Sequence, residues 1–316
     1  MKQFLSSCCL VALIAASSCP AIAGANKSRL RISGPPVAES LVFAIMAQQH
    51  PDRLTFTPWH SPDQARAMIA GGKIDVSLTT TSAAAIFYAK GIPVRIAGVF
   101  DSALWVISTK QSSGPLPMEG ILLFPFGHRE MPELLFNTIL GDRCPNLTTR
   151  HTGGALETAN LLQLGRADHA LLAEPAASLV LKRSNETGGP VLIKHLDLRQ
   201  EWGKKFNGLP LYVSALAVFG DATHRNEEIK ALVKFYNRTR IWIGEHPATA
   251  MAMAHETAPS ISTLMSESGD GIIAGQLFAD KRAFDAAFFF LGQIHSRYPD
   301  SLGDSFPDKR LFFGEN

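Results

Sequence analysis

A short unit that occurs twice constrains this chain more than any other feature of its sequence. The first copy runs Gly72-Lys73-Ile74-Asp75, continues through Leu78, and reaches Ser82-Ala83-Ala84. The second copy runs Gly165-Arg166-Ala167-Asp168, continues through Leu171, and reaches Pro175-Ala176-Ala177. Each copy has a glycine and a cation where a helical pattern ends, an aspartate before an apolar strand-like run, and a polar turn before a helix of small residues. The matched order predicts two lobes built on one plan.

Strand-length apolar runs alternate with helix-length segments through most of the chain. The predicted strands are 30–33, 54–57, 74–78, 94–99, 104–109, 121–126, 147–151, 170–173 and a long central strand at 211–219. The predicted helices are 37–49, 61–72, 82–91, 130–140, 155–164, 176–182 and 227–245, and the remainder to residue 298 is mostly helical. This alternation is typical of largely parallel sheets covered by helices. We therefore expect an α/β fold.

The N-terminus has the three parts of a secretory signal peptide. Lys2 supplies the positive charge, 5–16 is mostly apolar, and Ala21-Ile22-Ala23 fits the small-x-small cleavage rule. The apolar run is shorter than the ~20 residues of a membrane-spanning helix. We expect residues 1–23 to be a leader and the mature protein to be periplasmic. Lipidation at Cys19 is an alternative, although the box lacks the usual leucine and Pro20 follows the cysteine.

Length and composition limit the architecture and the partners. Without the leader roughly 290 residues remain, more than one compact core usually holds. We expect 24–109 to begin the first lobe, 110–210 to form the second, and 211–316 to return to the first lobe and add C-terminal helices. The formal net charge is only +2 and no basic block occurs, which argues against nucleic acid.

Cysteine usage predicts neither a disulfide nor a metal site. Cys8, Cys9 and Cys19 lie in the leader, so Cys144 alone remains after cleavage. A single cysteine has no partner within its own chain and gives no metal-ligand spacing. Cys144 suits either a reactive thiol or, as we favour, a small buried hydrophobic residue. No cofactor is expected.

Ligands of open parallel sheets bind beyond the carboxyl ends of the strands, where helices begin. Free amide groups and the helix dipole favour negative charge there. The candidate turns are Gly34-Pro35-Pro36, Trp59-His60-Ser61, Thr79-Thr80-Thr81-Ser82, Phe126-Gly127-His128-Arg129, Thr152-Gly153-Gly154 and Glu174-Pro175. From them we predict ligand contacts by Gly34, Pro35, Trp59, Thr80, Thr81, Ser82, Phe126, Gly127, His128, Arg129, Thr152, Gly153 and Glu174.

Several of these residues also have a structural interpretation that the sequence leaves open. The threonine run is typical of a strand that ends in a capping serine. Gly34 and Gly127 suit tight turns, and His128 suits a solvated loop. Trp59 suits either core packing or a platform for an aromatic or apolar part of a ligand.

Two charged residues bear on the kind of ligand. Arg129 suits either a bidentate grip on an anion or a surface salt bridge. Glu174 suits either a helix cap before Pro175 or a contact with a cationic group. If both face the ligand, a molecule that carries both charges fits best.

The order of motifs resembles the type II periplasmic binding proteins for nitrate, taurine, alkanesulfonates and thiamine-pyrimidine precursors. The matching stretches are 72–75 with 79–82, Ala89-Lys90-Gly91-Ile92-Pro93-Val94, 159–168, Ala173-Glu174-Pro175-Ala176, and Trp242-Ile243 with 246–250. The resemblance runs from about Leu30 to Ala254. The departures lie at 34–36, 117–120 and 126–129, so they fall in or near the ligand turns.

The resemblance implies a two-lobed type II fold with a ligand cleft between the lobes. It implies a monomeric, non-enzymatic solute-binding component of an ABC importer, with a permease in the inner membrane as its partner. For the ligand we favour a small organic anion of sulfonate or taurine type, with a pyrimidine-type thiamine precursor as the alternative. An enzyme on the same fold, or a ligand-sensing subunit of a signalling complex, is the alternative of another class. The enzymes that resemble this fold either carry a cysteine-rich motif or work in the cytoplasm, which disfavours the first of these.

Overall fold

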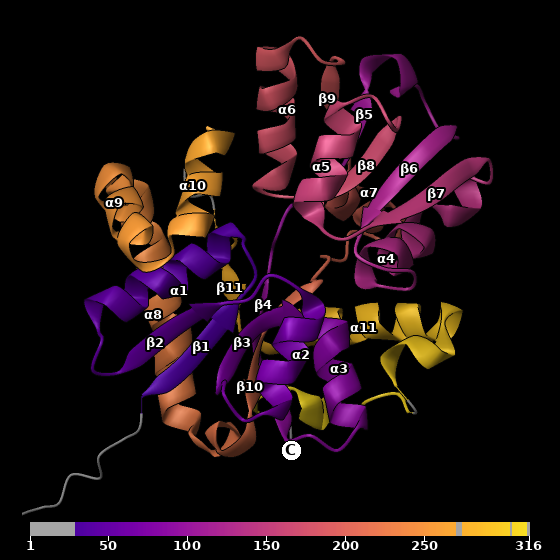
Figure 1. Ribbon diagram of the computed structural model, residues 1–316. Helices are drawn as coiled ribbons and strands as arrows, with labels where there is room; N and C mark the ends of the chain where they lie inside the picture. Colours follow the sequence, from indigo (N-terminus) through magenta and orange to yellow (C-terminus); the bar gives the residue numbers. More distant parts are fainter. Residues whose placement is uncertain (1–28, 270–273, 304, 315–316) are drawn as a thin grey trace, which may run out of the picture.

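A computed structural model describes residues 29–269, 274–303 and 305–314. The expected leader, its cleavage site and Cys19 lie outside these residues. The described chain forms two lobes, each a sheet covered by helices on both faces (Figure 1). Within the described residues, no helix is both long enough and apolar enough to span a bilayer.

The first lobe contains a six-stranded sheet with the order β11-β4-β10-β3-β1-β2. Its strands are β1 (Leu30–Gly34), β2 (Leu54–Pro58), β3 (Val76–Thr80), β4 (Val94–Phe100), β10 (Ser214–Phe219) and β11 (Leu277–Phe278). The helices α1 (Ala38–Gln49) and α8 (Asn226–Glu245) cover one face, and α2 (Pro62–Ala70), α3 (Thr81–Ala89) and α11 (Lys281–Arg297) cover the other. The helices α9 (Pro247–Thr257) and α10 (Pro259–Ser268) pack outside α1.

The second lobe contains a five-stranded sheet with the order β7-β6-β8-β5-β9. Its strands are β5 (Leu104–Thr109), β6 (Gly120–Pro125), β7 (Leu147–Thr152), β8 (His169–Ala173) and β9 (Leu192–Asp197). The helices α5 (Ala155–Gln163) and α6 (Ala176–Thr187) cover one face, and α4 (Met131–Ile139) and α7 (Leu198–Lys205) cover the other. The expected boundary at residue 109 assigns β5 to the first lobe, but its hydrogen bonds place it in the second sheet, so the chain crosses before Leu104.

The central strands are buried on both faces, and their side chains alternate between two cores. In β10, Ala215 and Ala217 belong to one hydrophobic cluster, whereas Leu216 and Val218 belong to the cluster on the opposite face. This alternation is the two-residue period of a strand. It explains why 211–219 has the continuous apolar pattern of a central strand, although the regular strand begins only at Ser214.

The repeated unit of the sequence is confirmed as one structural device in both lobes. Gly72 and Gly165 have φ values of 62° and 65°, and each ends its helix in the left-handed region that favours glycine. Asp75 accepts a hydrogen bond from the Arg31 amide at 2.8 Å, and Asp168 accepts one from the Ile121 amide at 2.8 Å. In each lobe the aspartate therefore fixes the start of a neighbouring parallel strand.

Strand direction orients the two sheets toward each other. The chain leaves the carboxyl end of β4 at Phe100 and enters the second lobe at Leu104. β3 and β4 both run antiparallel to β10, and β1 and β2 run parallel to β3. The four strands β1 to β4 therefore point the same way, and their carboxyl ends share one edge of the sheet, which faces the second lobe. β5 starts at the edge of the second sheet nearest the first lobe and runs antiparallel to β8 and β9. The carboxyl ends of β6 to β9 therefore face the first lobe.

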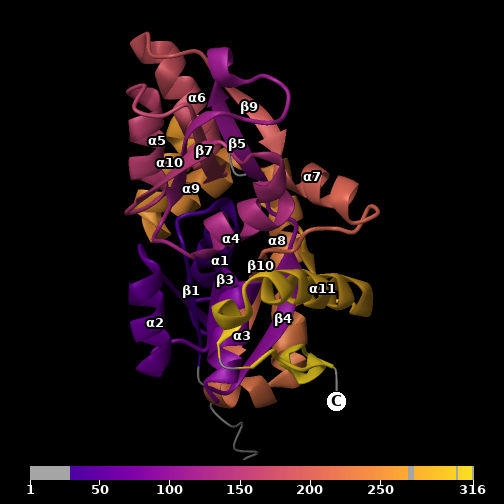
Figure 2. The same ribbon diagram turned by 90° about the vertical axis from the view of Figure 1, so that its right-hand side faces the viewer.

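An aromatic cluster joins the lobes on one side. Trp202 of α7 is fully buried, and its ring centroid lies 5.5 Å from that of Phe290 on α11. The Phe206 and Phe289 rings lie 5.4 Å apart, and an ion pair links Arg297 at the end of α11 to the second lobe. Figure 2 shows α4 of the second lobe above α11 and α3 of the first. Opening the lobes at this side would expose apolar surface, which is costly.

Cys144 is buried and free, as the favoured interpretation of the sequence required.

A second buried group was not anticipated. His169 is completely buried in β8, where its Nδ1 contacts the Ser108 hydroxyl at 2.7 Å and its Nε2 donates to the Glu119 carbonyl at 2.9 Å. Burial lowers the pKa of His169 below its usual value of 6.5.

This buried histidine predicts a loss of stability in mild acid. Because the folded state holds His169 neutral, its contribution is fully present above pH 6.5 and is lost as the unfolded chain takes up a proton below that pH. Between pH 7.5 and pH 5.5 we expect the wild type to lose more free energy of unfolding than His169→Gln, by at most about 1.4 kcal/mol per pH unit. Urea denaturation at several pH values measures this. His60→Gln, at an exposed loop position, is the control, and equal pH slopes for wild type and His169→Gln would contradict the assignment.

Candidate functional site

The predicted ligand turns lie on the two sheet edges that face each other. The ends of β1, β2 and β3 carry Gly34, Trp59 and Thr80 on the first lobe. The ends of β6, β7 and β8 carry Phe126, Thr152 and Glu174 on the second lobe. The topology thus gathers all the predicted turns at one interlobe face. Contact of individual residues with a ligand stays a prediction.

The turn after β1 is packed tightly. Gly34 is buried, and a Cβ added to it would lie 2.3 Å from the Ser40 hydroxyl and 3.3 Å from the Leu78 Cβ. Close approach of α1 to the sheet therefore accounts for this glycine. Pro35 is half-buried beside it, and no side chain caps the N-terminus of α1.

The threonine run at the end of β3 forms a cap, but the capping residue is Thr80 and not Ser82. The Thr80 hydroxyl accepts from the Ala83 amide at 3.1 Å and contacts the Ser82 hydroxyl at 2.9 Å. Thr81 is buried and donates to the Val213 carbonyl on the return segment. These bonds tie the start of α3 to the segment that re-enters the first lobe.

Trp59 is almost fully buried, and its indole Nε1 has no hydrogen-bond partner among the described residues. The helix that follows has the predicted start. The Ser61 hydroxyl accepts from the Gln64 amide at 3.2 Å, while Gln64 Oε1 accepts from the His60 amide at 2.8 Å, one residue before the cap. His60 itself is exposed.

The turn between β6 and α4 has an unusual backbone. Phe126 and Arg129 have φ values of 71° and 62°, in the left-handed region that non-glycine residues rarely occupy. Gly127 and His128, between them, are exposed. None of the described residues pairs with the Arg129 guanidinium, whereas the Arg129 amide donates to Glu133 Oε2 at 2.6 Å.

The turn after β7 is closed by its own polar groups. The Thr152 hydroxyl contacts that of Thr158 at 2.6 Å, and the Gly153 amide donates to Glu157 Oε2 at 2.6 Å. Glu174, after β8, acts as a cap. Its Oε2 accepts from the Ser178 amide at 3.1 Å, and its Oε1 lies 2.6 Å from Lys194 Nζ.

Each helix start at the interlobe face that lacks a serine or threonine cap carries a carboxylate of its own. Glu133, Glu157 and Glu174 serve α4, α5 and α6. In α1, the buried Glu39 accepts from the Ser102 hydroxyl at 2.9 Å and the Gly275 amide at 3.1 Å, and burial raises its pKa. The carboxylates of Glu133, Glu157 and Glu174 compensate the positive ends of their helices. The helix starts therefore attract anions less than the sequence argument assumed.

The lobes touch across the mouth of this face through an ion pair. Arg66 on α2 lies 2.8 Å from Glu130, which precedes α4, and it also pairs with Asp63. In Figure 2, α2 lies on the opposite side of the molecule from α7. A second contact joins α6 to α10, where Arg183 pairs with Glu267. The Arg66–Glu130 pair thus lies opposite the hinge segments that enter and leave the second lobe.

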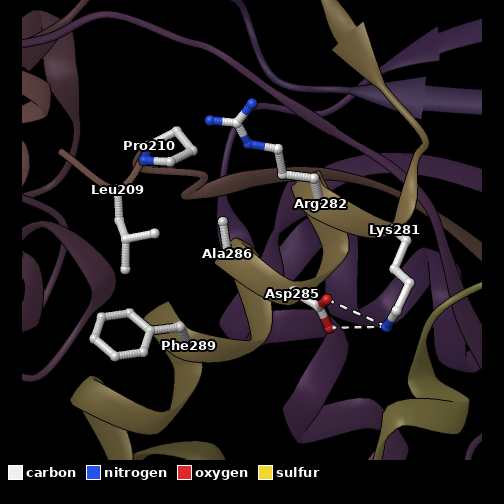
Figure 3. A pocket seen from close by; sticks show the side chains of 7 residues that line it. All are labelled: Leu209, Pro210, Lys281, Arg282, Asp285, Ala286 and Phe289. Atoms are coloured by element: carbon white, nitrogen blue, oxygen red, sulfur yellow. Dashed lines mark hydrogen bonds and ion pairs between the residues drawn. The ribbon is translucent and has the colours of Figure 1, made fainter. Parts of the chain in front are cut away.

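A surface hollow of about 590 Å³ lies on the hinge side. It is formed by Leu209 and Pro210 of the return segment, which face the first turns of α11 (Figure 3). Asp285 forms an ion pair with Lys281 at its rim. The hollow contains none of the predicted ligand residues.

Comparison with known proteins identifies the fold from structural similarity, whereas sequence comparison assigns no family. No family model and no curated protein matches the sequence. In structure, the chain is similar to an ABC transporter protein from Parabacteroides distasonis, with 19% identity, a TM-score of 0.71, and coverage of 91% of this chain and 99% of that one.

Two further solved structures are sulfonate-binding proteins. The periplasmic aliphatic sulphonate binding protein SsuA from Escherichia coli is 14% identical, with a TM-score of 0.65 and coverage of 90% and 96%. The alkanesulfonate-binding protein SsuA from Xanthomonas axonopodis pv. citri, bound to MOPS, is 12% identical, with a TM-score of 0.63 and coverage of 91% and 97%. The chain has the two-lobed periplasmic binding protein fold. The facing strand ends described above form the interlobe face of this fold.

Sequence reasoning missed several polar residues of this periplasmic binding protein fold. Glu39, Glu133, His151 and Glu157 all lie at the cleft-side ends of helices or strands. The acid at the third position of α4 and of α5 is a capping signal that the sequence contains. Nothing in the sequence indicated that His151, at the end of β7, would reach Glu133.

Packing at Gly34 can be separated from ligand binding by matched alanine substitutions. We expect Gly34→Ala to lower the free energy of unfolding by about 1–3 kcal/mol, because its Cβ would overlap the Ser40 hydroxyl. Gly127→Ala, with open space around it, should change stability by less than about 0.5 kcal/mol. Urea denaturation measures both. Adding Ser40→Ala should restore part of the loss, and equal stability of the two glycine variants would refute the packing explanation.

The Arg66–Glu130 pair should bias the lobes toward closure. Spin labels at Ala70→Cys and Thr148→Cys, two exposed positions on different lobes, report the interlobe distance. Arg66→Ala and Glu130→Ala should each shift the distances to longer values, and the double variant should add nothing to either. The pair is half-exposed, so its coupling free energy should not exceed about 1 kcal/mol. Unchanged distances in both single variants, or additive shifts, would show that the pair does not couple the lobes.

Proposed function

We propose that this chain is the extracytoplasmic solute-binding component of an ABC importer. The observation that carries the proposal is the arrangement of the two sheets, whose parallel strands present their carboxyl ends to each other while, within the described residues, two segments cross between the lobes. We infer that these two edges line a ligand cleft. Such a cleft closes on a small molecule by rotation of one lobe about the crossings. The solved structures with this fold reported above include an ABC transporter protein and periplasmic binding proteins.

The contacts between the lobes are stronger on the hinge side than at the mouth, so separating the lobes costs more free energy on the hinge side. The aromatic cluster of α7 and α11 holds the lobes together near the crossings, whereas the half-exposed Arg66–Glu130 ion pair bridges the opposite side. Exposed pairs contribute at most about 1 kcal/mol, much less than burial of several aromatic rings. The mouth therefore opens in preference to the hinge side. A bound solute shifts the population to the closed form that a permease in the inner membrane recognises.

For the solute we propose a small organic anion of sulfonate type, taurine-like ligands included. Two of the similar structures are sulfonate-binding proteins. Arg129 lies at the cleft-side end of β6, and none of the described residues neutralises its guanidinium, so it is available for a bidentate contact with an oxyanion. Glu174 is paired with Lys194. It is therefore less available to bind the amine of a zwitterionic ligand.

A planar heterocycle, such as a pyrimidine-type thiamine precursor, is the second candidate ligand. The buried Trp59 Nε1 without a partner favours it, because an unsatisfied indole N–H costs free energy that a ligand acceptor would recover. Trp105 and Phe126 are half-buried, but Lys194 already lies over the Trp105 ring at 5.1 Å. The sulfonate proposal therefore has the stronger support.

A screen of purified protein tests the function and the solute together. We expect alkanesulfonates to raise the melting temperature by several degrees and to bind in isothermal titration, while nitrate, amino acids and pyrimidines do not. Arg129→Ala should weaken sulfonate binding by about 10- to 100-fold, the worth of a charge-assisted contact. Arg53→Ala, which removes an exposed arginine that pairs only with Asp52 in the described residues, is the matched control.

The outcomes separate the proposals. A response to pyrimidines and not to sulfonates would favour the second ligand and overturn the first. A protein that binds sulfonates equally well with and without Arg129 would retain the receptor function and refute the role of this residue. No response to any small molecule would contradict the receptor proposal and favour a signalling or enzymatic role.

A further inference from the structure

The geometry points to a divalent transition-metal site on the second lobe, formed by His128, Glu133 and His151. His128 Nδ1 lies 3.0 Å from Glu133 Oε2, and His151 Nε2 lies 3.1 Å from the same oxygen. The three donor atoms all lie within 4.8 Å of one another. We propose that this trio binds Zn²⁺ or a similar borderline cation through one imidazole nitrogen of each histidine and the Glu133 carboxylate.

The separations of the two histidine nitrogens from Glu133 Oε2 are close to those around a bound zinc ion. Zinc–nitrogen and zinc–oxygen bonds of about 2.0–2.2 Å at tetrahedral angles place neighbouring donor atoms about 3.3–3.6 Å apart. The two measured separations are only a few tenths of an ångström shorter. Small rotations of the side chains would therefore admit the ion, without movement of the backbone. Two imidazoles and one carboxylate suit zinc, nickel or copper, and not the hard cations Mg²⁺ and Ca²⁺.

The fold brings the three donors together from separate elements. Glu133 lies in the first turn of α4, and its side chain is only 9% exposed. His151 lies near the end of β7, which pairs in parallel register with β6, and its ring packs 5.9 Å from that of Phe124. His128 comes from the turn between Phe126 and Arg129, whose left-handed backbone directs it back toward Glu133. A strained turn that orients a metal-binding side chain is a recognised use of such strain.

One donor is buried and one is open to solvent. The His128 side chain is 69% exposed, against 25% for His151. An ion bound here therefore keeps at least one coordination position accessible from outside, as in zinc sites with three protein ligands. The Arg129 amide donates to Glu133 Oε2 and so helps to orient this carboxylate.

A bound cation would reverse the charge of this part of the cleft. The site adjoins Glu130 and the interlobe pair with Arg66. Without an ion, the Glu133 carboxylate compensates the positive end of α4. With one, a net positive centre stands beside Arg129, at the turn proposed to bind an anion. The metal site itself depends only on the three side chains and is independent of the solute.

Metal binding to untagged, chelator-stripped protein tests the site directly. Isothermal titration with Zn²⁺ should give one ion per chain, and Mg²⁺ and Ca²⁺ should give no binding. Co²⁺ should give the visible absorption of a tetrahedral N/O complex. His128→Ala and His151→Ala should each weaken Zn²⁺ binding at least tenfold and abolish the Co²⁺ spectrum, and Glu133→Gln should do the same while keeping the shape of the side chain.

His60→Ala is the matched control, because it removes an exposed histidine from a cleft-side turn of the other lobe. It should leave Zn²⁺ affinity unchanged. His128→Ala carries the decisive test, since its side chain is mostly exposed and its loss should leave the fold intact by circular dichroism. Absence of Zn²⁺ binding to the wild type, or a Zn²⁺ affinity of His128→Ala and His151→Ala that equals the wild-type affinity, would overturn the proposal.

Discussion

The facing edges of the two sheets depend on the two places where the described chain crosses between them. β5 and β10 each enter a sheet in the direction opposite to its parallel strands, and each lies inside the sheet and not at its edge. Because a parallel strand and the helix after it meet at the carboxyl edge, these reversed strands turn both carboxyl edges toward each other. Every predicted ligand turn then lies at one interface, and the packing of α11 against α7 joins the lobes on the hinge side.

Electrostatics at this interface are more balanced than helix dipoles alone would make them. Glu133, Glu157 and Glu174 lie at the starts of three helices, so carboxylates of the protein already compensate part of the positive potential. The Arg129 guanidinium and any cation held by His128 and His151 are then the main local sources of positive charge. Selection of an anionic solute would rest on these groups and not on the helix starts.

Much of the architecture follows from the sequence. The repeated unit predicted equivalent helix ends and strand starts in the two lobes, and Gly72, Gly165, Asp75 and Asp168 occupy equivalent positions. The start of the helix predicted from residue 61 was also correct, because Ser61 caps it and capping depends on neighbours within four residues. The capping role of Thr80 was assigned to Ser82, since several adjacent hydroxyls satisfy the same local rule. β9 and α7 were not recognised, because their polar residues disguise the strand and helix periods.

The sequence by itself determined the fold class, the order of the elements and the turns that follow the strands, because periodicity and capping are local properties of the chain. Only the tertiary structure decided which of those turns carry free charge and which are already satisfied. The pairing of β6 with β7 sets Phe124 beside His151, and that register brings His151 within reach of Glu133. Such pairings depend on distances between separate elements, which packing fixes and no spacing along the chain encodes.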